Sequence, residues 1–381
     1  MKKFDVIIIG AGPAGCSSAL TFQSSGLQVG LFEKDEFPRN KICGDGICDR
    51  SINTLRAICP HYVDEFLKTV QSQPISKTAL VYKSHIYTLE FSSFGYTCKR
   101  YEFDNFLFSL VQRDCKNVEI FQNVCVSHIE QYKQGYVLYV QSQKIAWAPL
   151  VIIANGAKSQ IAQALTGEKF SKSNYGVAVR AYYTGVQGMN SDTIELHYKK
   201  EYFPGYLWIF PLAHNQANVG FGYHMQDAQK FSTTIHNLMN NWIQEDPKLR
   251  ERFAHAHIIS PIHGGLIPYN TNEFNCSGNN YMICGDAASL IDPISGGGIG
   301  SAMLSGHLAA MYAVECCKIQ DFSAAATKKY EEHLKKRIQK EIKTRYYIQQ
   351  KVSKYRGILD VLSIIGKNTS LLNRIKRWYI Q

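Results

Sequence analysis

The first thirty-three residues have a pattern of apolar and small residues that predicts strand, turn, helix and strand. Residues 4–9 are mostly aliphatic and β-branched, which is typical of a buried parallel strand. Small residues follow at 10–16, a helical pattern at 17–24, and a second apolar run at 27–32 that ends in Glu33. This order predicts a βαβ unit with a glycine-rich turn between its first strand and its helix.

Two kinds of strand are expected along the rest of the chain. A continuous apolar run at 150–154 indicates another buried strand of the first sheet, whereas alternation through 177–223 indicates an antiparallel sheet. Helices are expected at 51–67, 100–111, 226–245 and 301–314, hairpin strands at 79–82 and 86–91, and further strands at 118–121, 124–131, 135–141 and 280–284.

The glycine turn has the spacing of a dinucleotide-binding fingerprint. Gly10 allows the tight turn, Gly12 lets the backbone approach a pyrophosphate, and Gly15 lets the helix pack closely on the strand. The helix N-terminus, which includes Pro13 and Ala14, offers free N–H groups to an anion. A bound nucleotide is therefore expected at this turn.

Two further features narrow the nucleotide to FAD. Glu33, eighteen residues after Gly15, is placed to bind ribose hydroxyls and argues against a 2′-phosphate. Asp286 ends a predicted strand and can accept a hydrogen bond from a ribityl hydroxyl, and the glycines at 296–300 let the backbone lie against a flavin. FAD is longer than NAD and needs support at both ends, so two such loops favour tightly bound FAD.

Composition bounds the class of protein. The 381 residues are 45% hydrophobic and 19% charged, which is typical of a folded protein of two domains. The chain begins on the nucleotide strand, which predicts no signal peptide, and no apolar run reaches the ~18 residues of a membrane span. Eleven cysteines without a CxxC pair predict reduced thiols in a cytoplasmic protein and no metal site.

The net charge of +11 lies entirely in the C-terminal part of the chain. From Lys328 to the end there are fifteen Lys and Arg against four Asp and Glu, interleaved with apolar residues at helical spacing. Two interpretations stay open: a solvated helix face packed on the core, or an amphipathic helix bound peripherally at the inner face of a membrane. No nucleic-acid motif accompanies the charge, so nucleic acid is not an expected partner.

Several separated motifs together resemble the FAD-dependent oxidoreductases with the fold of p-hydroxybenzoate hydroxylase, and within them the geranylgeranyl reductase family. The resemblance covers residues 1–320. It rests on the fingerprint, Glu33, Arg100 with Phe103–Asp104, and Gly285–Asp286 with the glycines after it. A further segment, Tyr206-Leu207-Trp208-Ile209-Phe210-Pro211 followed by Gly220 and Gly222, is similar to the YxWxFP and GxG pattern of the reductases.

The patterns and the resemblance together imply an α/β fold. A discontinuous Rossmann-type FAD-binding domain is expected to carry an inserted antiparallel β-sheet substrate domain and a helical C-terminal segment. The expected boundaries are 1–76, 98–172 and 263–320 for the FAD-binding domain, a hairpin at 77–97 and a sheet at 173–262 for the substrate domain, and 321–381 for the basic helical segment.

The resemblance also implies which residues contact the cofactor. They are Gly10, Gly12, Pro13, Ala14, Gly15, Glu33, Lys34, Arg39, Cys43, Gly44, Arg100, Val124, Asn155, Gly156, Gly285, Asp286, Pro293, Gly296, Gly297, Gly298 and Ile299.

An aromatic stripe and a cysteine are the expected reactive features. Tyr206, Trp208 and Phe210 alternate, so on a strand they project from one face and would form a wall over the flavin for an apolar substrate, beside Gly220 and Gly222. Cys43, Tyr206 and Trp208 are the expected catalytic residues, with Cys43 or Tyr206 as a proton donor. The alternative for an aromatic stripe is ordinary core, and for a cysteine it is packing.

The sequence departs from the hydroxylase relatives in one motif. Asn155–Gly156 stands where those relatives carry Asp–Gly, in a motif that touches both flavin and NADPH. The chain also lacks a second glycine fingerprint for a separate nicotinamide domain. NAD(P)H, or another electron donor, is therefore expected to bind transiently.

These observations predict an FAD-dependent reductase of carbon–carbon double bonds in an isoprenoid (geranylgeranyl-type) or similar lipid. Two alternatives remain open because fold does not fix chemistry. One is an FAD-dependent monooxygenase or halogenase of an aromatic or polyketide substrate. The other is an electron-transfer flavoprotein that donates to a quinone.

Overall fold

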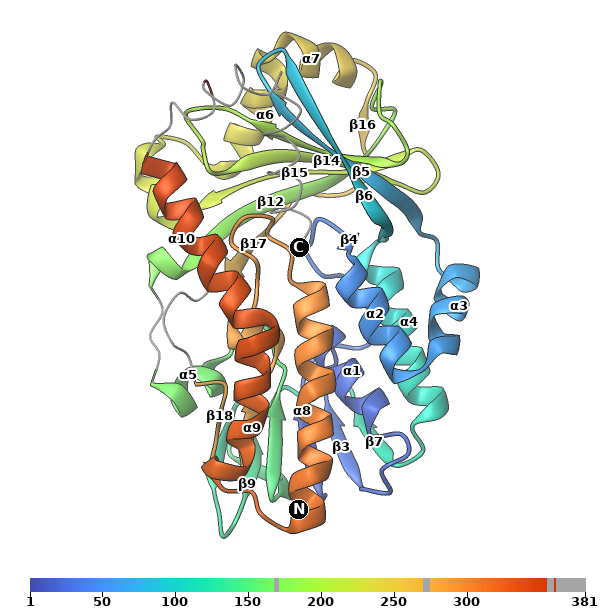
Figure 1. Ribbon diagram of the computed structural model, residues 1–381, viewed down its shortest axis with the longest axis vertical. Helices are drawn as coiled ribbons and strands as arrows, with labels where there is room; N and C mark the ends of the chain where they lie inside the picture. Colours follow the sequence, from blue (N-terminus) through green and yellow to red (C-terminus); the bar gives the residue numbers. More distant parts are fainter. Residues whose placement is uncertain (168–170, 270–274, 355–359, 361–381) are drawn as a thin grey trace.

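The computed structural model describes residues 1–167, 171–269, 275–354 and 360. Figure 1 shows a parallel sheet with its helices in the lower half of the molecule and a broad antiparallel sheet across the upper half. Segments far apart in the chain form the lower half, as expected for a discontinuous domain. The residue limits given above for the domains stay a prediction.

The parallel sheet is built on its most apolar strands. Its centre is β2 (Val6–Ile9), flanked by β3 (Val29–Phe32) and β11 (Leu150–Ile153), and all three are buried along their whole length. Burial on both faces explains why these strands are continuous apolar runs. The outer strands are β7 (Val118–Phe121) beside β3 and β19 (Tyr281–Ile283) beside β11. The short strand β18 (Ser277–Gly278) pairs antiparallel with β19 at the edge.

Helices α1 (Pro13–Thr21), α4 (Arg100–Asp114) and α8 (Ile299–Ile319) pack on this sheet and on one another. Helices α1 and α8 approach each other closely at Gly306, where an added Cβ would lie 2.0 Å from the carbonyl oxygen of Ala14. The short helices α5 (Gln160–Thr166) and η3 (Gly285–Ala288) follow β11 and β19. A small sheet, ordered β1 (Lys2–Lys3), β10 (Gln143–Ala148), β9 (Tyr136–Val140) and β8 (His128–Gln131), completes the lower half.

Three predicted elements have different limits in the structure. The helix expected at 51–67 is two helices, α2 (Asp49–Ile58) and α3 (Pro60–Thr69), because Pro60 has no N–H to donate and Cys59 before it is extended. The strand expected at 124–131 begins only at His128. The helix expected at 226–245 is a short helix η2 (Met225–Lys230) and then α6 (Ile235–Glu245), which the Thr234 side chain caps by accepting from the Asn237 N–H.

Within the described residues, the second sheet has nine strands and is antiparallel except where β13 pairs with β5. Its core is β12 (Tyr175–Thr184), β15 (Gln216–His224), β14 (Tyr206–Leu212) and β13 (Thr193–Tyr198). The chain enters β12 through η1 (Lys172–Asn174). The hairpin β5 (Gln73–Tyr82) and β6 (His85–Thr97) extends the sheet, and β4 (Gly46–Ile47), β16 (His257–Ile258) and β17 (His263–Pro268) join its borders.

The two faces of this sheet have different neighbours. One face carries Leu207, Ile209, Val219 and Phe221 into a core with α6 and α7 (Pro247–Phe253), where Trp242 is fully buried. Residues alternate across a strand, so the intervening positions, including Tyr206, Trp208 and Phe210, lie on the other face. Figure 1 shows that this second face lies toward the parallel sheet and its loops.

The C-terminal segment is helical over residues 324–354. Helix α9 (Ala324–Leu334), a π-helical turn (Lys335–Gln339) and α10 (Lys340–Lys354) run along the side of the molecule and reach the antiparallel sheet (Figure 1). Their apolar stripe, Tyr330, Leu334, Ile338 and Ile342, is buried in the main core. The apolar face of residues 324–354 therefore packs on the core, as the first of the two interpretations expected. Apart from Asp360, the rest of the segment lies outside the described residues. Among described residues no helix is long and apolar enough to cross a membrane.

Candidate flavin and substrate site

The fingerprint turn has the close backbone contacts that require glycine. Gly10 has φ +100°, and an added Cβ would lie 2.5 Å from the carbonyl oxygen of Ala154 at the end of β11. A Cβ on Gly15 would lie 1.8 Å from the carbonyl oxygen of Gly10. Gly12 is the N-cap of α1, and Pro13 is the first helical residue. No side chain caps this helix, so backbone N–H groups are left at its N-terminus. This is the local structure that accepts a phosphate group.

Glu33 lies at the same turn. Its side chain is buried, and its carboxylate accepts hydrogen bonds from the Ala11 N–H at 2.6 Å and the Asp35 N–H at 3.0 Å. Its carbonyl accepts from the Val124 N–H at 2.8 Å, which brings the predicted residue Val124 to the same edge. Lys34 is instead exposed, and its amine forms an ion pair with Asp35 at 3.7 Å.

A buried carboxylate joins the two predicted arginines. Asp104 accepts two hydrogen bonds from the Arg100 guanidinium, at 2.5 and 2.7 Å, and its second oxygen lies 3.2 Å from Nη1 of Arg39. Nη2 of Arg39 lies 3.6 Å from where a Cβ on Gly12 would be. Within the described part of the chain, Nε of Arg39 is buried without a hydrogen-bond partner. Arg39 therefore presents a cation over the fingerprint.

Asn155 and Gly156 follow β11 on the other side of the fingerprint. Oδ1 of Asn155 is buried and has no hydrogen-bond partner among the described residues. Gly156 has φ +84°, and no atom lies within 4 Å of the position that its Cβ would occupy. The turn thus leaves space where a bulky group could lie against the backbone.

The second glycine loop is held in shape by Asp292. Its carboxylate accepts from the Ile294 N–H and the Ser295 hydroxyl, each at 2.9 Å, and pairs with Arg345 of α10. Gln349 of α10 donates to the carbonyl of Pro293 at 2.5 Å. Helix α10 therefore clamps the loop that contains the predicted residues Pro293, Gly296, Gly297, Gly298 and Ile299.

The two glycine-rich regions are adjacent in space. Gly285, with φ +60°, packs against α1, since its Cβ would lie 3.2 Å from the Cβ atoms of Ala14 and Ala302. A Cβ on Gly298 would lie 3.4 Å from Oδ1 of Asp286. Both regions thus border the N-terminal end of α1.

The residues present fit FAD. The fingerprint and Glu33 suit the adenosine half, and the 285–299 region suits the ribityl and flavin half. Two buried polar atoms, Nε of Arg39 and Oδ1 of Asn155, still have hydrogen-bonding capacity at this site. Among described residues, no group of three or more His, Cys, Asp or Glu side chains could hold a metal ion.

The strand register explains the spacing of the aromatic and glycine motifs. Tyr206 pairs with Gly222 and Trp208 with Gly220 across β14 and β15. Directly opposed residues share a face of the sheet, so each ring lies over a glycine. A Cβ on Gly220 would lie 2.1 Å from Cζ2 of Trp208. We call Tyr206, Trp208 and Phe210 the aromatic row.

Two loops of the lower half contact the aromatic row. A Cβ on Gly44 would lie 3.4 Å from the Phe210 ring and 3.6 Å from Nε1 of Trp208. At the other end, the Tyr206 hydroxyl donates to the carbonyl of Ser295 at 2.5 Å, and the Gly296 Cβ position lies 3.3 Å from that hydroxyl. The structure thus brings the predicted cofactor loops and the predicted substrate wall together.

A buried polar network that the sequence analysis did not predict lies beneath this contact. Asn218 accepts from Nε1 of Trp208 at 2.9 Å, and its amide nitrogen donates to the Cys43 carbonyl and to Oδ2 of Asp45, each at 2.8 Å. The same Oδ2 accepts from the Tyr182 hydroxyl at 2.8 Å. The network connects the cysteine loop to β12, β14 and β15.

Cys43 is half-buried beside Arg100. Burial raises the pKa of the Cys43 thiol above its ordinary value, and the Arg100 guanidinium opposes that shift. The thiol therefore keeps its proton at neutral pH. All eleven cysteines are free thiols.

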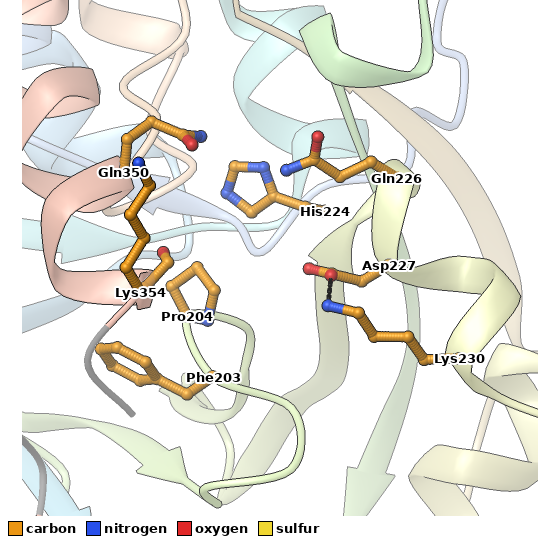
Figure 2. A pocket seen from close by; sticks show the side chains of 9 residues that line it. Phe203, Pro204, His224, Gln226, Asp227, Lys230, Gln350 and Lys354 are labelled. Atoms are coloured by element: carbon orange, nitrogen blue, oxygen red, sulfur yellow. Dashed lines mark hydrogen bonds and ion pairs between the residues drawn. The ribbon is translucent and has the colours of Figure 1, made fainter. Parts of the chain in front are cut away.

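A polar cavity of about 130 Å³ is bordered by His224 of β15 and by residues of α10 (Figure 2). His224 lies two residues beyond Gly222 on β15, so it belongs to the same face of the sheet. Burial lowers the pKa of His224 to about 4, and the ring is neutral at physiological pH. The cavity is lined by Phe203, Pro204, His224, Gln226, Asp227, Lys230, Gln350, Ser353 and Lys354.

Comparison with known proteins agrees with this geometry. A family profile described as FAD binding domain matches residues 3–205, and one described as geranylgeranyl reductase catalytic domain matches residues 174–266. Digeranylgeranylglycerophospholipid reductase 2 of Methanopyrus kandleri is 27% identical over 87% of this chain and 82% of its own length. Menaquinone reductase of Mycolicibacterium smegmatis is 25% identical over 87% and 81%.

Solved structures share the fold. A geranylgeranyl bacteriochlorophyll reductase-like protein of Thermoplasma acidophilum has a TM-score of 0.83 at 22% identity, covering 96% of this chain and 91% of that one. A flavin-dependent brominase has a TM-score of 0.80 at 19% identity, covering 99% and 93%. The predicted fold class and FAD cofactor are confirmed. The chain belongs to the geranylgeranyl reductase family of FAD-dependent oxidoreductases.

Proposed function

We propose that this protein reduces carbon–carbon double bonds of an isoprenoid lipid. One observation carries the proposal: the aromatic row, opposed by Gly220 and Gly222, faces the Gly44 and Gly296 loops of the FAD-binding half. A flat wall of three rings at that place suits an apolar, unsaturated chain and offers few groups to a polar substrate. The relatives named above carry isoprenoid lipids or a quinone in their names.

FAD, when bound, supplies the hydride for such a reduction. The work of this chain is to hold the alkene, exclude water and provide a proton to the second carbon. We assign holding and exclusion to the aromatic row. We assign FAD binding to the fingerprint, Glu33, Arg39, Asn155 and the 285–299 region.

The proton donor is best assigned to Cys43. The Tyr206 hydroxyl already donates to Ser295, and the Trp208 N–H donates to Asn218. The Cys43 thiol keeps its proton because of burial, and after donation Arg100 lies beside the resulting thiolate. Tyr206 and Trp208 then act in binding and in shaping the wall.

The direction of the lipid follows from the two ends of the row. Phe210 lies at the Cys43 loop, whereas Tyr206 lies opposite Gly222, two residues before His224 of the polar cavity. We infer that the isoprenoid chain lies along the row and that its polar end points to the cavity. We propose that NAD(P)H, or another electron donor, visits the flavin transiently.

The test is anaerobic. The purified FAD-loaded protein is photoreduced and mixed with a geranylgeranyl lipid, and flavin absorbance is followed. We expect the oxidised spectrum to return with the unsaturated lipid and to stay absent with the fully saturated analogue. Return of the oxidised spectrum only on admission of air would contradict the proposal and favour an oxygen-using enzyme.

A further inference from the structure

Asp45 is a fully buried carboxyl group that the proposed function does not yet use. Its side chain is 0% exposed, and the residue has φ +67°, a left-handed conformation that Asp and Asn tolerate better than most residues. It follows Cys43 and Gly44 in the loop that contacts the aromatic row. Burying a carboxyl group is unfavourable unless its surroundings satisfy it or it carries a proton.

The two oxygens of this carboxyl group have different surroundings. Oδ2 accepts from the Tyr182 hydroxyl and from the Asn218 amide, each at 2.8 Å. Oδ1 is buried and has no hydrogen-bond partner within the described residues. One oxygen is therefore fixed in place, and the other is the atom able to carry a proton.

Of the charged groups that the structure describes, none forms a direct ion pair with Asp45. Arg180 of β12 lies with its guanidinium carbon 4.1 Å from the centre of the Tyr182 ring, and Arg100 lies on α4. Lys99 lies 5.1 Å above the Tyr182 ring, and the Cys98 N–H donates to the Asp45 carbonyl. Burial raises the pKa of Asp45 to about 6, although Asn218, Tyr182, Arg180 and Arg100 all oppose the shift.

Asp45 is coupled to Cys43 through the backbone and through Asn218. The Asn218 amide nitrogen bonds both the Cys43 carbonyl and Oδ2 of Asp45, and the Asp45 backbone N–H interacts with the Cys43 sulfur. Asn218 therefore holds both the carboxyl group of Asp45 and the backbone of Cys43, which lies two residues before it.

We propose that Asp45 is the proton reservoir of the site and returns a proton from its carboxyl group to Cys43 Sγ after the thiol has protonated the substrate. The S–H bond breaks as the C–H bond forms, and the O–H bond of Asp45 breaks as the S–H bond reforms. The carboxylate then regains a proton from water. Both electrons come from the reduced flavin, so neither residue changes oxidation state. Asp45 is a positioning and proton-supplying residue, and the inference rests on the proposed function.

The first test compares pH profiles of steady-state lipid saturation by the FAD-loaded wild type, Asp45→Asn and Tyr182→Phe under anaerobic, multiple-turnover conditions, with dithionite as the flavin reductant. Asn keeps the accepting oxygen for Tyr182 and Asn218 but cannot hold the proton. We expect the wild-type rate to fall above about pH 6, and Asp45→Asn to be about tenfold slower or more at pH 6 and to lack that break. Tyr182→Phe removes a hydrogen bond that lowers the Asp45 pKa, so its break moves to higher pH.

The second test reads the carboxyl group without turnover. Infrared difference spectra, wild type minus Asp45→Asn, are recorded over the same pH range with oxidised FAD bound. We expect a protonated-carboxyl band that disappears with a midpoint near pH 6, and we expect this midpoint to lie at higher pH in Tyr182→Phe. The reservoir is refuted if Asp45→Asn keeps the wild-type profile or if the band is missing. A wild type that saturates no lipid overturns the proposed function itself, whatever the infrared result.

Discussion

At the scale of single residues, the site depends on side chains that serve two partners at once. Asn218 holds Trp208 on one side and the Cys43 loop on the other, and Asp104 holds both Arg39 and Arg100. Shared partners fix the relative positions of groups from separate strands and loops. A single substitution at such a residue therefore disturbs several contacts together.

The buried Asp45 predicts a pH-dependent stability difference. Its folded pKa of about 6 lies above the ordinary 3.8, so the ionised form is disfavoured by folding. The free-energy cost of this ionisation is absent at pH values below the pKa of the unfolded state and complete at pH values above the pKa of the folded state. A difference of about two between these pKa values corresponds to about 3 kcal/mol. Asp45→Asn lacks the cost.

We therefore expect the unfolding free energy of the wild type, relative to Asp45→Asn, to fall by about 3 kcal/mol between about pH 4 and pH 8. Urea unfolding of both proteins at saturating FAD measures this difference. Parallel stability curves would show that Asp45 is not perturbed.

At the scale of elements, the pairing of β14 with β15 places each of the rings of Tyr206 and Trp208 over a glycine. Gly220→Ala would place a Cβ 2.1 Å from the Trp208 ring and 2.5 Å from the Val179 carbonyl oxygen. Gly222→Ala meets the Ala178 Cβ at 3.0 Å, so it is the matched, milder change.

We expect Gly220→Ala to displace Trp208, to destabilise the fold by about 1–3 kcal/mol and to reduce lipid saturation at least tenfold. FAD content is expected to stay at the wild-type level, because the change lies on the substrate sheet. Absorbance of bound FAD, thermal unfolding and single-turnover rates check these outcomes; equal losses in Gly222→Ala would argue against the specific fit of Trp208.

The contacts that hold the second glycine loop against α10 lead to another prediction. Arg345 pairs with Asp292 and with Glu341, which also pairs with Arg50 of α2. Arg345→Gln frees a half-buried carboxylate at the loop, and we expect FAD to bind about tenfold more weakly, equivalent to about 1.4 kcal/mol. Lys351→Gln, an exposed change on the same helix, is the control. Unchanged FAD affinity in Arg345→Gln would mean that the clamp has no role in binding.

At the scale of the whole molecule, the proposed function places the isoprenoid chain along the aromatic row with its polar end toward the cavity. Lys354 lies at the edge of the cavity and is exposed. For a lipid with an anionic headgroup, we expect Lys354→Gln to raise KM about two- to fivefold with little change in kcat, because one screened charge contributes about 1 kcal/mol or less. Lys351→Gln is again the control. A KM effect equal for charged and neutral lipids would contradict this orientation.

Local patterns made part of this molecule predictable from its sequence. Strands such as β2 and β11 are continuous apolar runs, and the fingerprint carries its own spacing, so the parallel sheet and the first glycine turn could be identified. The break at Pro60 follows a known rule that the apolar periodicity of 51–67 obscured. The buried stripe of α9 and α10 was visible in the spacing of Tyr330, Leu334, Ile338 and Ile342.

The polar network could not be predicted in the same way. Tyr182 and Asn218 are opposed across β12 and β15, but the Asp45 loop reaches them only when the tertiary structure forms, and the sequence gives no local pattern for that contact. Asn218 alone had a signal: a hairpin whose turn lies at 213–215 places residue 218 opposite Phe210. The role of α10 as a clamp on Asp292 was likewise hidden behind its positive charge.

The most direct test of the central claim is the mass of the lipid after anaerobic reaction with the photoreduced, FAD-loaded protein. Our account predicts a product that is heavier by two hydrogen atoms for each double bond reduced, with no added oxygen or halogen, and a strongly reduced yield from Gly220→Ala. An unchanged lipid, or a product that carries oxygen or halogen and forms only in air, would contradict the assignment of this protein as a double-bond reductase.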